Sequence, residues 1–175
     1  MIDVTAEKGY GATSVADVLK RAGVSRLTFY QNFSHKEECF TAAYDLVAEA
    51  VLSKLLPGFE TSATSGTPMD AVVAAVGAYL EALADEPAVA KVFLVEVYAA
   101  GPQLLARRSA VQKTVVQVIA DLLSASTPAQ HLACEAMVGA IVSLATTRVA
   151  DGDFDGLRSL HAPLSELIRG LADRI

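Results

Sequence analysis

Residues 14–37 read SVADVLKRAGVSRLTFYQNFSHKE, and this stretch decides how the N-terminal part of the chain folds. Ser14 and Asp17 form a capping box, in which the serine hydroxyl accepts an amide at the start of a helix and the acid reaches back. Apolar residues follow at i, i+3 and i+4 spacing, at Val15, Val18 and Leu19. This pattern predicts a helix over 14–21 with one face packed against a core.

The tetrapeptide AGVS at 22–25 ends that helix and starts another within four residues. Gly23 suits the left-handed position that follows a helix end, and Ser25 caps the next helix. Phe29 and Phe33 share one face of this second helix, so we expect them to anchor it inward. The other faces carry Arg, Thr, Tyr and Gln, which is typical of the helix that enters the major groove in a helix-turn-helix.

A second capping box is predicted at Ser34-His35-Lys36-Glu37, where a longer helix begins. Lys36 lies beside the positive end of that helix, where it can meet a phosphate. A capped helix pair with a glycine turn also occurs in all-α proteins that do not bind DNA. The combination of caps, exposed polar faces and a basic residue at the next helix start favours the DNA-binding interpretation.

This part of the chain resembles the TetR family of bacterial repressors over about residues 8–45. The matching residues are Gly9-Tyr10-Gly11-Ala12-Thr13-Ser14-Val15, Ala22-Gly23-Val24-Ser25, Thr28-Phe29-Tyr30, Phe33 and Lys36-Glu37. The resemblance implies a homodimer that binds a palindromic operator in double-stranded DNA and is released when a ligand binds the C-terminal domain. It places five residues on phosphates or adjacent sugars, namely Ser14, Ser25, Thr28, Tyr30 and Lys36. The residues left as candidates to contact bases are Arg26, Leu27 and Gln31.

Two features depart from the family pattern. Leu27 stands where the family commonly has glycine, so we expect a different approach of this helix to DNA. The first helix, over 2–8, is shorter than that of the family, which is normally preceded by a basic arm, and we expect that the sequence starts inside it. These departures leave an alternative open, a dimeric small-molecule-binding helical protein whose DNA binding is weak or lost.

The charge of the chain is divided unevenly between its two ends. Residues 1–36 carry five basic and three acidic side chains, a balance of +2, whereas residues 37–175 have a balance of −8. The positive balance at the N-terminus indicates an anionic partner there, and the acidic remainder repels polyanions.

Apolar residues make up 53% of the 175 residues. The longest apolar stretches, 71–84 and 132–150, are interrupted by charged residues, so we expect no membrane span of roughly 18 uninterrupted apolar residues. No secretion signal opens the chain, and Cys39 and Cys134 lack metal-ligand spacing. These observations predict a cytoplasmic protein with free thiols, whose surplus apolar surface forms a rich core and a subunit interface.

Apolar residues recur at helical spacing along the chain, and strand-like alternation is nearly absent. The expected helices cover 2–8, 14–21, 25–32, 35–55, 69–84, 87–99, 102–124, 128–150 and 157–173. The sequence therefore predicts an all-α protein with a three-helix helix-turn-helix headpiece, the DNA-binding domain, over 1–45. The helix over 35–55 joins it to a larger helical-bundle domain, 46–175, that binds a ligand and dimerises.

Two helices of the second domain carry candidate dimer contacts. The helix over 128–150 bears small residues that permit close helix approach, and the last helix bears an apolar stripe. The predicted interface residues are Ala136, Gly139, Ala140, Leu164, Leu167 and Ile168. The same stripes also suit the core of a monomer, which is the alternative.

Candidate contacts for an apolar small-molecule effector lie inside the apolar helices, because ligand pockets are mostly apolar with a few placed polar groups. These candidates are Tyr44, Phe93, Glu96, Tyr98, Met137 and Ile141. For the polar members, a hydrogen-bonded structural role is the alternative.

Two further classes of function are disfavoured. His131 and Glu135 lie one helical turn apart but lack further ligands nearby, so we expect no metal and no cofactor. We also expect no enzyme activity, because the chain contains no Gly-x-Ser-x-Gly, no phosphate loop and no paired Glu-x-x-His motif.

Overall fold

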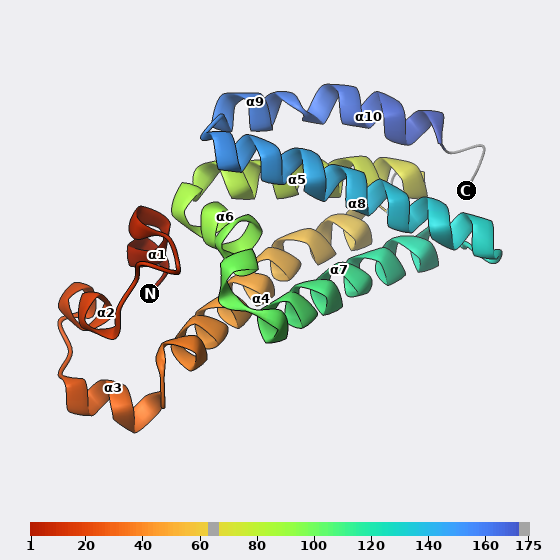
Figure 1. Cartoon of the computed structure of the whole chain (residues 1–175). Coiled ribbons are helices and arrows are strands. Elements are labelled where there is room, and N and C mark those ends of the chain that lie inside the picture. Colours follow the sequence, from red (N-terminus) through yellow and green to blue (C-terminus); the bar gives the residue numbers. More distant parts are fainter. Residues whose placement is uncertain (63–66, 172–175) are drawn as a thin grey trace.

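The computed structural model describes residues 1–62 and 67–171, and it describes side chains for residues 1–53 and 67–171. Within these ranges every regular element is a helix, as the sequence predicts. The order is α1 Ile2–Lys8, α2 Val15–Ala22, α3 Arg26–Asn32, α4 Lys36–Ser62, α5 Pro68–Asp85, α6 Pro87–Leu94, the 3₁₀ helix η1 Glu96–Ala100, α7 Pro102–Leu122, α8 Pro128–Asp151, α9 Phe154–Ser159 and α10 His161–Gly170. Figure 1 shows the headpiece, α1–α3, at one end and the body, α5–α10, at the other, with α4 running between them.

The headpiece helices are short, and their ends are fixed by side chains. Ser14 and Asp17 form the predicted capping box at the start of α2, and Gly23 ends this helix in the left-handed conformation with φ 67°. Ser25 accepts a hydrogen bond from the Thr28 amide at the start of α3. Each such cap stabilises a helix by about 1 kcal/mol, which matters most for helices of two turns.

The helix α4 takes part in two hydrophobic cores. Near its start, Cys39 packs with Val18 and Phe29 in the small core of the headpiece. A buried stripe that begins one residue later faces the body, and it consists of Phe40, Tyr44, Val47, Ala48 and Val51. One continuous helix therefore belongs to both cores.

The capping box predicted at Ser34 is displaced by one residue. The helix α4 begins at Lys36, and the Nδ1 atom of His35 accepts a hydrogen bond from the Glu38 amide at 3.2 Å. The Glu38 carboxylate accepts one from the Ser34 amide at 2.6 Å, and this bond holds the pKa of Glu38 below its usual value. The predicted pairing was wrong because an imidazole nitrogen takes the place of the serine hydroxyl.

Three other helix ends differ from the predictions. The helix α4 continues through Pro57 to Ser62, and the helix expected over 87–99 ends at Leu94 and continues as η1. The helix expected over 157–173 is two helices, α9 and α10, and its residues 172–173 lie outside the described residues. The first of these starts early because the Asp153 carboxylate accepts a hydrogen bond from the Gly156 amide at 2.8 Å.

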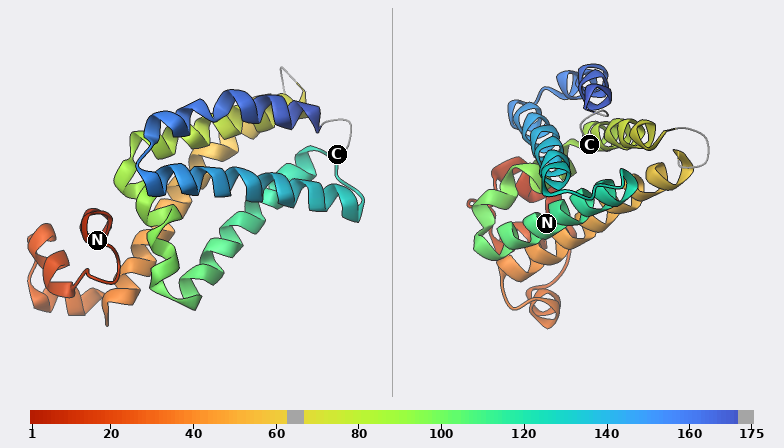
Figure 2. Two further views of the ribbon diagram at one scale, coloured as in Figure 1. Left: turned by 45° about the horizontal axis from the view of Figure 1, so that its top comes forward. Right: turned by 90° about the vertical axis from the view of Figure 1, so that its right-hand side faces the viewer.

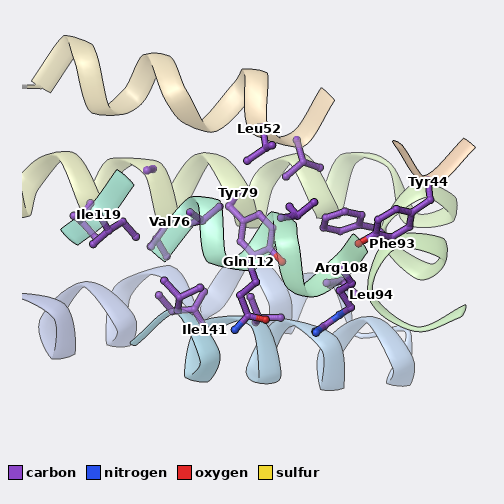
Figure 3. A pocket seen from close by; sticks show the side chains of 17 residues that line it. Tyr44, Leu52, Val76, Tyr79, Phe93, Leu94, Arg108, Gln112, Ile119 and Ile141 are labelled. Atoms are coloured by element: carbon purple, nitrogen blue, oxygen red, sulfur yellow. The ribbon is translucent and has the colours of Figure 1, made fainter. Parts of the chain in front are cut away.

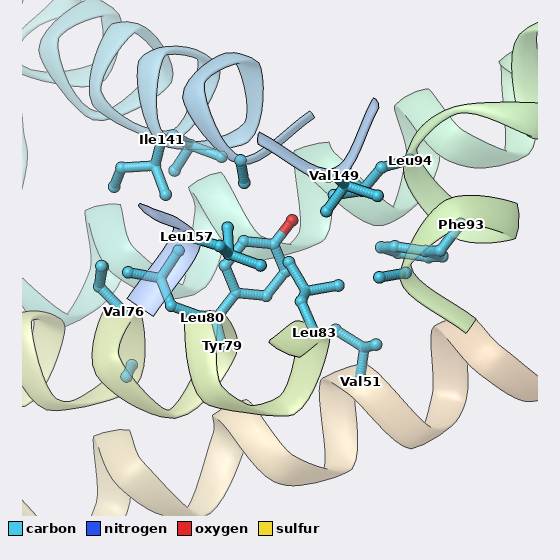
Figure 4. Packing of buried hydrophobic residues seen from close by; sticks show 14 of the residues in the cluster. Val51, Val76, Tyr79, Leu80, Leu83, Phe93, Leu94, Ile141, Val149 and Leu157 are labelled. Atoms are coloured by element: carbon cyan, nitrogen blue, oxygen red, sulfur yellow. The ribbon is translucent and has the colours of Figure 1, made fainter. Parts of the chain in front are cut away.

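The body is built around α5, which is buried on most of its surface. It packs against α4 on one side and against α6, α9 and α10 on the others. Figure 4 shows Leu80 and Leu83 of α5 beside Leu157 of α9 and Val149 of α8. Arg158 of α9 adds ion pairs to two acids of α5, at 3.0 Å to Glu81 and 2.7 Å to Asp85. Figure 2 shows α5 and the helices packed around it from two further directions.

Among the described residues, α8 is the one helix whose length and composition would allow it to cross a membrane. From the sequence we expected no such span, because charged residues interrupt this stretch. Core helices of globular proteins meet the same criterion, and 33% of the stretch is buried inside the chain. The remainder includes an exposed stripe of small and apolar residues.

Candidate DNA-binding surface and ligand cavity

The helix α3 lies at the edge of the headpiece that is far from α8–α10 (Figure 1). Phe29 is buried, with its ring centre 5.5 Å from that of Phe33, so the two phenylalanines anchor the helix as predicted. Leu27 is 70% exposed and Tyr30 is 50% exposed. The other exposed side chains of the outer faces are Arg26, Thr28 and Gln31. The three predicted base contacts therefore lie on one short helix that is open to solvent.

Three of the predicted phosphate contacts, Ser14, Ser25 and Thr28, lie at the starts of α2 and α3, and Tyr30 lies further along α3. The Ser14 hydroxyl accepts a hydrogen bond from the Asp17 amide at 3.2 Å and donates one to the Asp17 carboxylate at 2.6 Å. The Ser25 hydroxyl accepts one from the Thr28 amide at 3.0 Å, and the two hydroxyl oxygens are 2.9 Å apart. These side chains remain exposed beside the positive ends of their helices.

Lys36 is directed inward, which corrects the expectation that its charge is free to meet a phosphate. Its Nζ atom donates a hydrogen bond to the carbonyl oxygen of Tyr10 at 2.9 Å. It also lies 4.1 Å from the centre of the Tyr10 ring. Sequence patterns could not predict this contact, because 26 residues separate the two positions. Lys36 therefore holds the turn after α1 against the start of α4.

Two basic side chains of the headpiece form ion pairs within it. Lys8 pairs with Asp17, and this hydrogen bond holds the pKa of the Asp17 carboxyl well below its usual range. Arg21 pairs with Glu7 and, at 3.5 Å, with Asp3. In contrast, Arg26 is exposed and forms no ion pair with any described residue. Its guanidinium is therefore available on α3 to contact an external group.

Two side chains of the α6–η1 segment hold the headpiece to the body. The amide of Tyr10 donates a hydrogen bond to Oε2 of Glu96 at 2.7 Å. Nζ of Lys91 donates one to the carbonyl oxygen of Ala6, near the end of α1, at 2.7 Å. Glu96 was predicted to contact the ligand, and the structure corrects this. Its carboxylate is engaged with the headpiece backbone.

An elongated cavity lies in the body between α4, α5, α6, α7 and α8 (Figure 3). Its empty space, counting the part that is open to solvent, is about 730 Å³. It is lined mainly by apolar side chains. The lining residues are Tyr44, Val51, Leu52, Val72, Ala75, Val76, Tyr79, Phe93, Leu94, Arg108, Val111, Gln112, Val115, Ile119, Val138, Ile141 and Val142.

Three of the six predicted ligand contacts line this cavity, namely Tyr44, Phe93 and Ile141. Glu96, Met137 and Tyr98 do not line it, so the prediction that they border the ligand is corrected. Met137 is buried in the core of the body, and Tyr98 is exposed on η1 with its ring centre 5.0 Å from the Arg108 guanidinium. The sequence placed all six within apolar helices, but it could not tell which side of each helix borders the cavity.

The hydroxyl of Tyr44 is the notable polar group of the cavity wall. Tyr44 is fully buried, its ring stacks on that of Phe93 with 5.3 Å between centres, and its Oη atom has no hydrogen-bond partner among the described residues. Burial raises the pKa of Tyr44 to about 12, so the hydroxyl is a neutral donor near pH 7. Leaving such a group unpaired costs about 1–3 kcal/mol, and this cost favours a ligand that accepts a hydrogen bond from the hydroxyl.

The predicted dimer contacts separate into an exposed and a buried group. Ala136 and Ala140 are exposed on α8, Gly139 is half-buried between them, and Leu167 of α10 is 55% exposed. Leu164 and Ile168 are buried in the core of the same chain, in the helix that packs against α5. Their place in a subunit interface is therefore corrected, because only the opposite face of α10 is free to meet a partner.

Residues 2–43 match the family model described as bacterial regulatory proteins, tetR family. A solved transcriptional regulator from Rhodococcus sp. RHA1 is 26% identical, with a TM-score of 0.81, over 98% of this chain and 91% of that chain. FadR from Bacillus subtilis, solved in complex with stearoyl-CoA, is 22% identical, with a TM-score of 0.80, over 95% and 92%. The fatty acid degradation regulator FadR from Bacillus halodurans is 19% identical, with a TM-score of 0.76, over 95% and 92%. No curated protein sequence matches the chain.

The contact between Glu96 and the Tyr10 amide predicts a measurable effect on the headpiece. Glu96→Ala removes a hydrogen bond to a charged group, so hydrogen exchange of the Tyr10 amide should accelerate about tenfold or more. Exchange followed by NMR measures this. Glu86→Ala is the matched control, because Glu86 is exposed and makes no side-chain cap. Equal exchange rates at Tyr10 in the Glu96 variant and the parent chain would show that the contact does not hold the headpiece.

Proposed function

We propose that the chain is a DNA-binding transcriptional regulator of the TetR family and that it acts in the cytoplasm as a homodimeric repressor. Its two α3 helices bind a palindromic operator, and a small molecule that fills the cavity of the body releases the dimer. The observation that carries this proposal is the double role of α4. The same helix packs in the headpiece core at Cys39 and borders the cavity at Tyr44.

DNA recognition is assigned to the exposed faces of α3 and to the helix starts beside it. Arg26, Leu27 and Gln31 contact base edges in the major groove. The hydroxyls of Ser14, Ser25, Thr28 and Tyr30 contact phosphates, which position the headpiece without reading sequence. Lys36 contributes indirectly, because its bond to the Tyr10 carbonyl fixes the turn beside α2.

Dimerisation is assigned to the exposed faces of α8 and α10. Ala136, Gly139 and Ala140 are small and permit close approach of the α8 helices of two subunits, and Leu167 supplies apolar surface beside them. A two-fold interface of this kind sets two headpieces against two half-sites of a palindrome. It also explains why α8 is apolar on a side that the chain itself leaves open.

Signalling is assigned to the two segments that connect the cavity to the headpiece. Phe93 and Leu94 line the cavity, and they lie on the chain between Lys91 and Glu96, which bind the headpiece backbone. A ligand that displaces α6 and α4 therefore changes the distance between the two α3 helices. Operator binding requires that distance to be near one turn of DNA, roughly 34–36 Å. The ligand acts by binding more tightly to the conformation in which the distance between the two α3 helices does not match one turn of DNA.

A solved protein of the same fold supports the proposal that this chain binds a ligand. FadR from Bacillus subtilis has the same overall fold, and its solved structure contains stearoyl-CoA. We therefore infer that the apolar cavity of this chain is an effector site.

The assignment of base contacts predicts a change in specificity. Gln31→Ala and Arg26→Ala should relax base preference at one or two base pairs of each half-site, by about 1–3 kcal/mol against the preferred base. Selection from a randomised DNA pool measures the preference. Lys113→Ala, at an exposed position on α7, is the control and should leave it unchanged. The placement of α3 is wrong if neither α3 variant changes the selected sequence.

The assignment of the dimer surface predicts a loss of assembly. Leu167→Arg and Ala140→Arg should each dissociate the dimer, because each places a charge in an apolar contact. Operator binding should collapse in the same variants, since a monomer reaches one half-site. Sedimentation velocity measures the assembly state, and Thr114→Arg, at an exposed position on α7, is the control. Stable dimers in both variants contradict the assignment.

A further inference from the structure

We propose that the effector is an elongated apolar carboxylate, with its carboxylate bound by Arg108 and Tyr44 at one end of the cavity and its hydrocarbon chain along α7. This inference rests on the proposed function, because it names the chemical class of the molecule that fills the same cavity.

The first observation is the pairing of arginines. Of the seven arginines among the described residues, five form ion pairs with Asp or Glu, namely Arg21, Arg107, Arg148, Arg158 and Arg169. The two without an ion pair are Arg26, on α3, and Arg108, which lines the cavity. Arg107 makes the contrast direct, because it precedes Arg108 and pairs with Asp45 at 2.7 Å.

The second observation is the polarity of the cavity wall. Its lining contains no Asp or Glu, so Arg108 has no counter-charge within the cavity. The buried hydroxyl of Tyr44 lacks a hydrogen-bond partner among the described residues and lies at the same end of the cavity as Arg108 (Figure 3). A guanidinium and a neutral hydroxyl donor together match a carboxylate, which is an acceptor of hydrogen bonds with a negative charge.

The third observation is the gradient of polarity along the cavity. Arg108, Gln112, Val115 and Ile119 recur on one face of α7, so that this face changes from charged to polar to apolar. At the rise of a helix, these positions extend over about 16 Å. Figure 3 shows Ile119 and Val76 at the end opposite to Tyr44 and Arg108. A ligand whose carboxylate lies beside Arg108 therefore places its alkyl chain toward the apolar end of the cavity at Ile119 and Val76.

The test compares ligands that share a chain and differ in head group. Isothermal titration of the full chain uses dodecanoate, 1-dodecanol, dodecyltrimethylammonium and dodecanoyl-CoA as probes. Dodecanoate should bind about tenfold or more tightly than 1-dodecanol, because it adds charge-assisted hydrogen bonds. The ammonium probe should bind most weakly, since its charge repels that of Arg108.

Two variants locate the carboxylate. Arg108→Gln should weaken the binding of dodecanoate about tenfold or more and leave that of 1-dodecanol within about twofold, whereas the control Arg107→Gln should leave both within about twofold. Tyr44→Phe should also weaken the binding of dodecanoate, yet leave the thermal unfolding midpoint unchanged or higher, because the lost hydroxyl has no partner in the free protein. A lower midpoint in Tyr44→Phe contradicts its role as a ligand donor.

Three results overturn the inference: no binding of dodecanoate, equal binding of dodecanoate and 1-dodecanol, or binding of dodecanoyl-CoA alone. The same probes are then added to the complex of protein and selected operator, which tests the proposed function separately. Release of DNA by 1-dodecanol, but not by dodecanoate, retains the ligand-responsive repressor and rejects the carboxylate. Arg108-dependent binding of dodecanoate without release of DNA retains the carboxylate and rejects the proposed signalling.

Discussion

Helix α4 has to fill two cores at once, and this constraint sets the positions of the elements around it. Cys39 is buried with Val18 and Phe29 in the headpiece, and the adjacent Phe40 is fully buried in the body. Adjacent residues of a helix point in directions about 100° apart, so one turn of α4 faces both cores. The orientation of α3, and with it the direction of the reading surface, follows from how α4 lies in the body.

Two arginines that form no ion pair among the described residues lie at the two proposed binding sites. Other arginines are paired, as Arg158 is with two acids of α5. Arg26 is available for the proposed contact with DNA, and Arg108 is available for the proposed carboxylate. The contacts of Lys91 and Glu96 with the headpiece backbone lie between these two sites. These contacts therefore link the segment that lines the cavity to the headpiece that carries Arg26.

Much of the fold could be predicted from the sequence, because local chemistry determines it. The Ser14 box, Gly23 and Ser25 depend on neighbours within four residues, and the structure confirms all three. Contacts over long separations could not be predicted, such as that of Glu96 with Tyr10, 86 residues away. Apolar periodicity likewise marked α10 as amphipathic but could not show that Leu164 and Ile168 face its own α5. Arg108 was missed because a charged residue on an amphipathic helix ordinarily faces solvent.

The claim that filling the cavity moves the headpieces through α4 is tested most directly by the distance between the headpieces of one dimer. Burial raises the pKa of the native thiols of Cys39 and Cys134, so a spin label reacts selectively at Lys20→Cys, an exposed position on α2. Pulsed electron paramagnetic resonance then gives the distance with and without saturating dodecanoate. A shift of this distance that accompanies operator release is the predicted result. An unchanged distance distribution while the operator is released would contradict the claim.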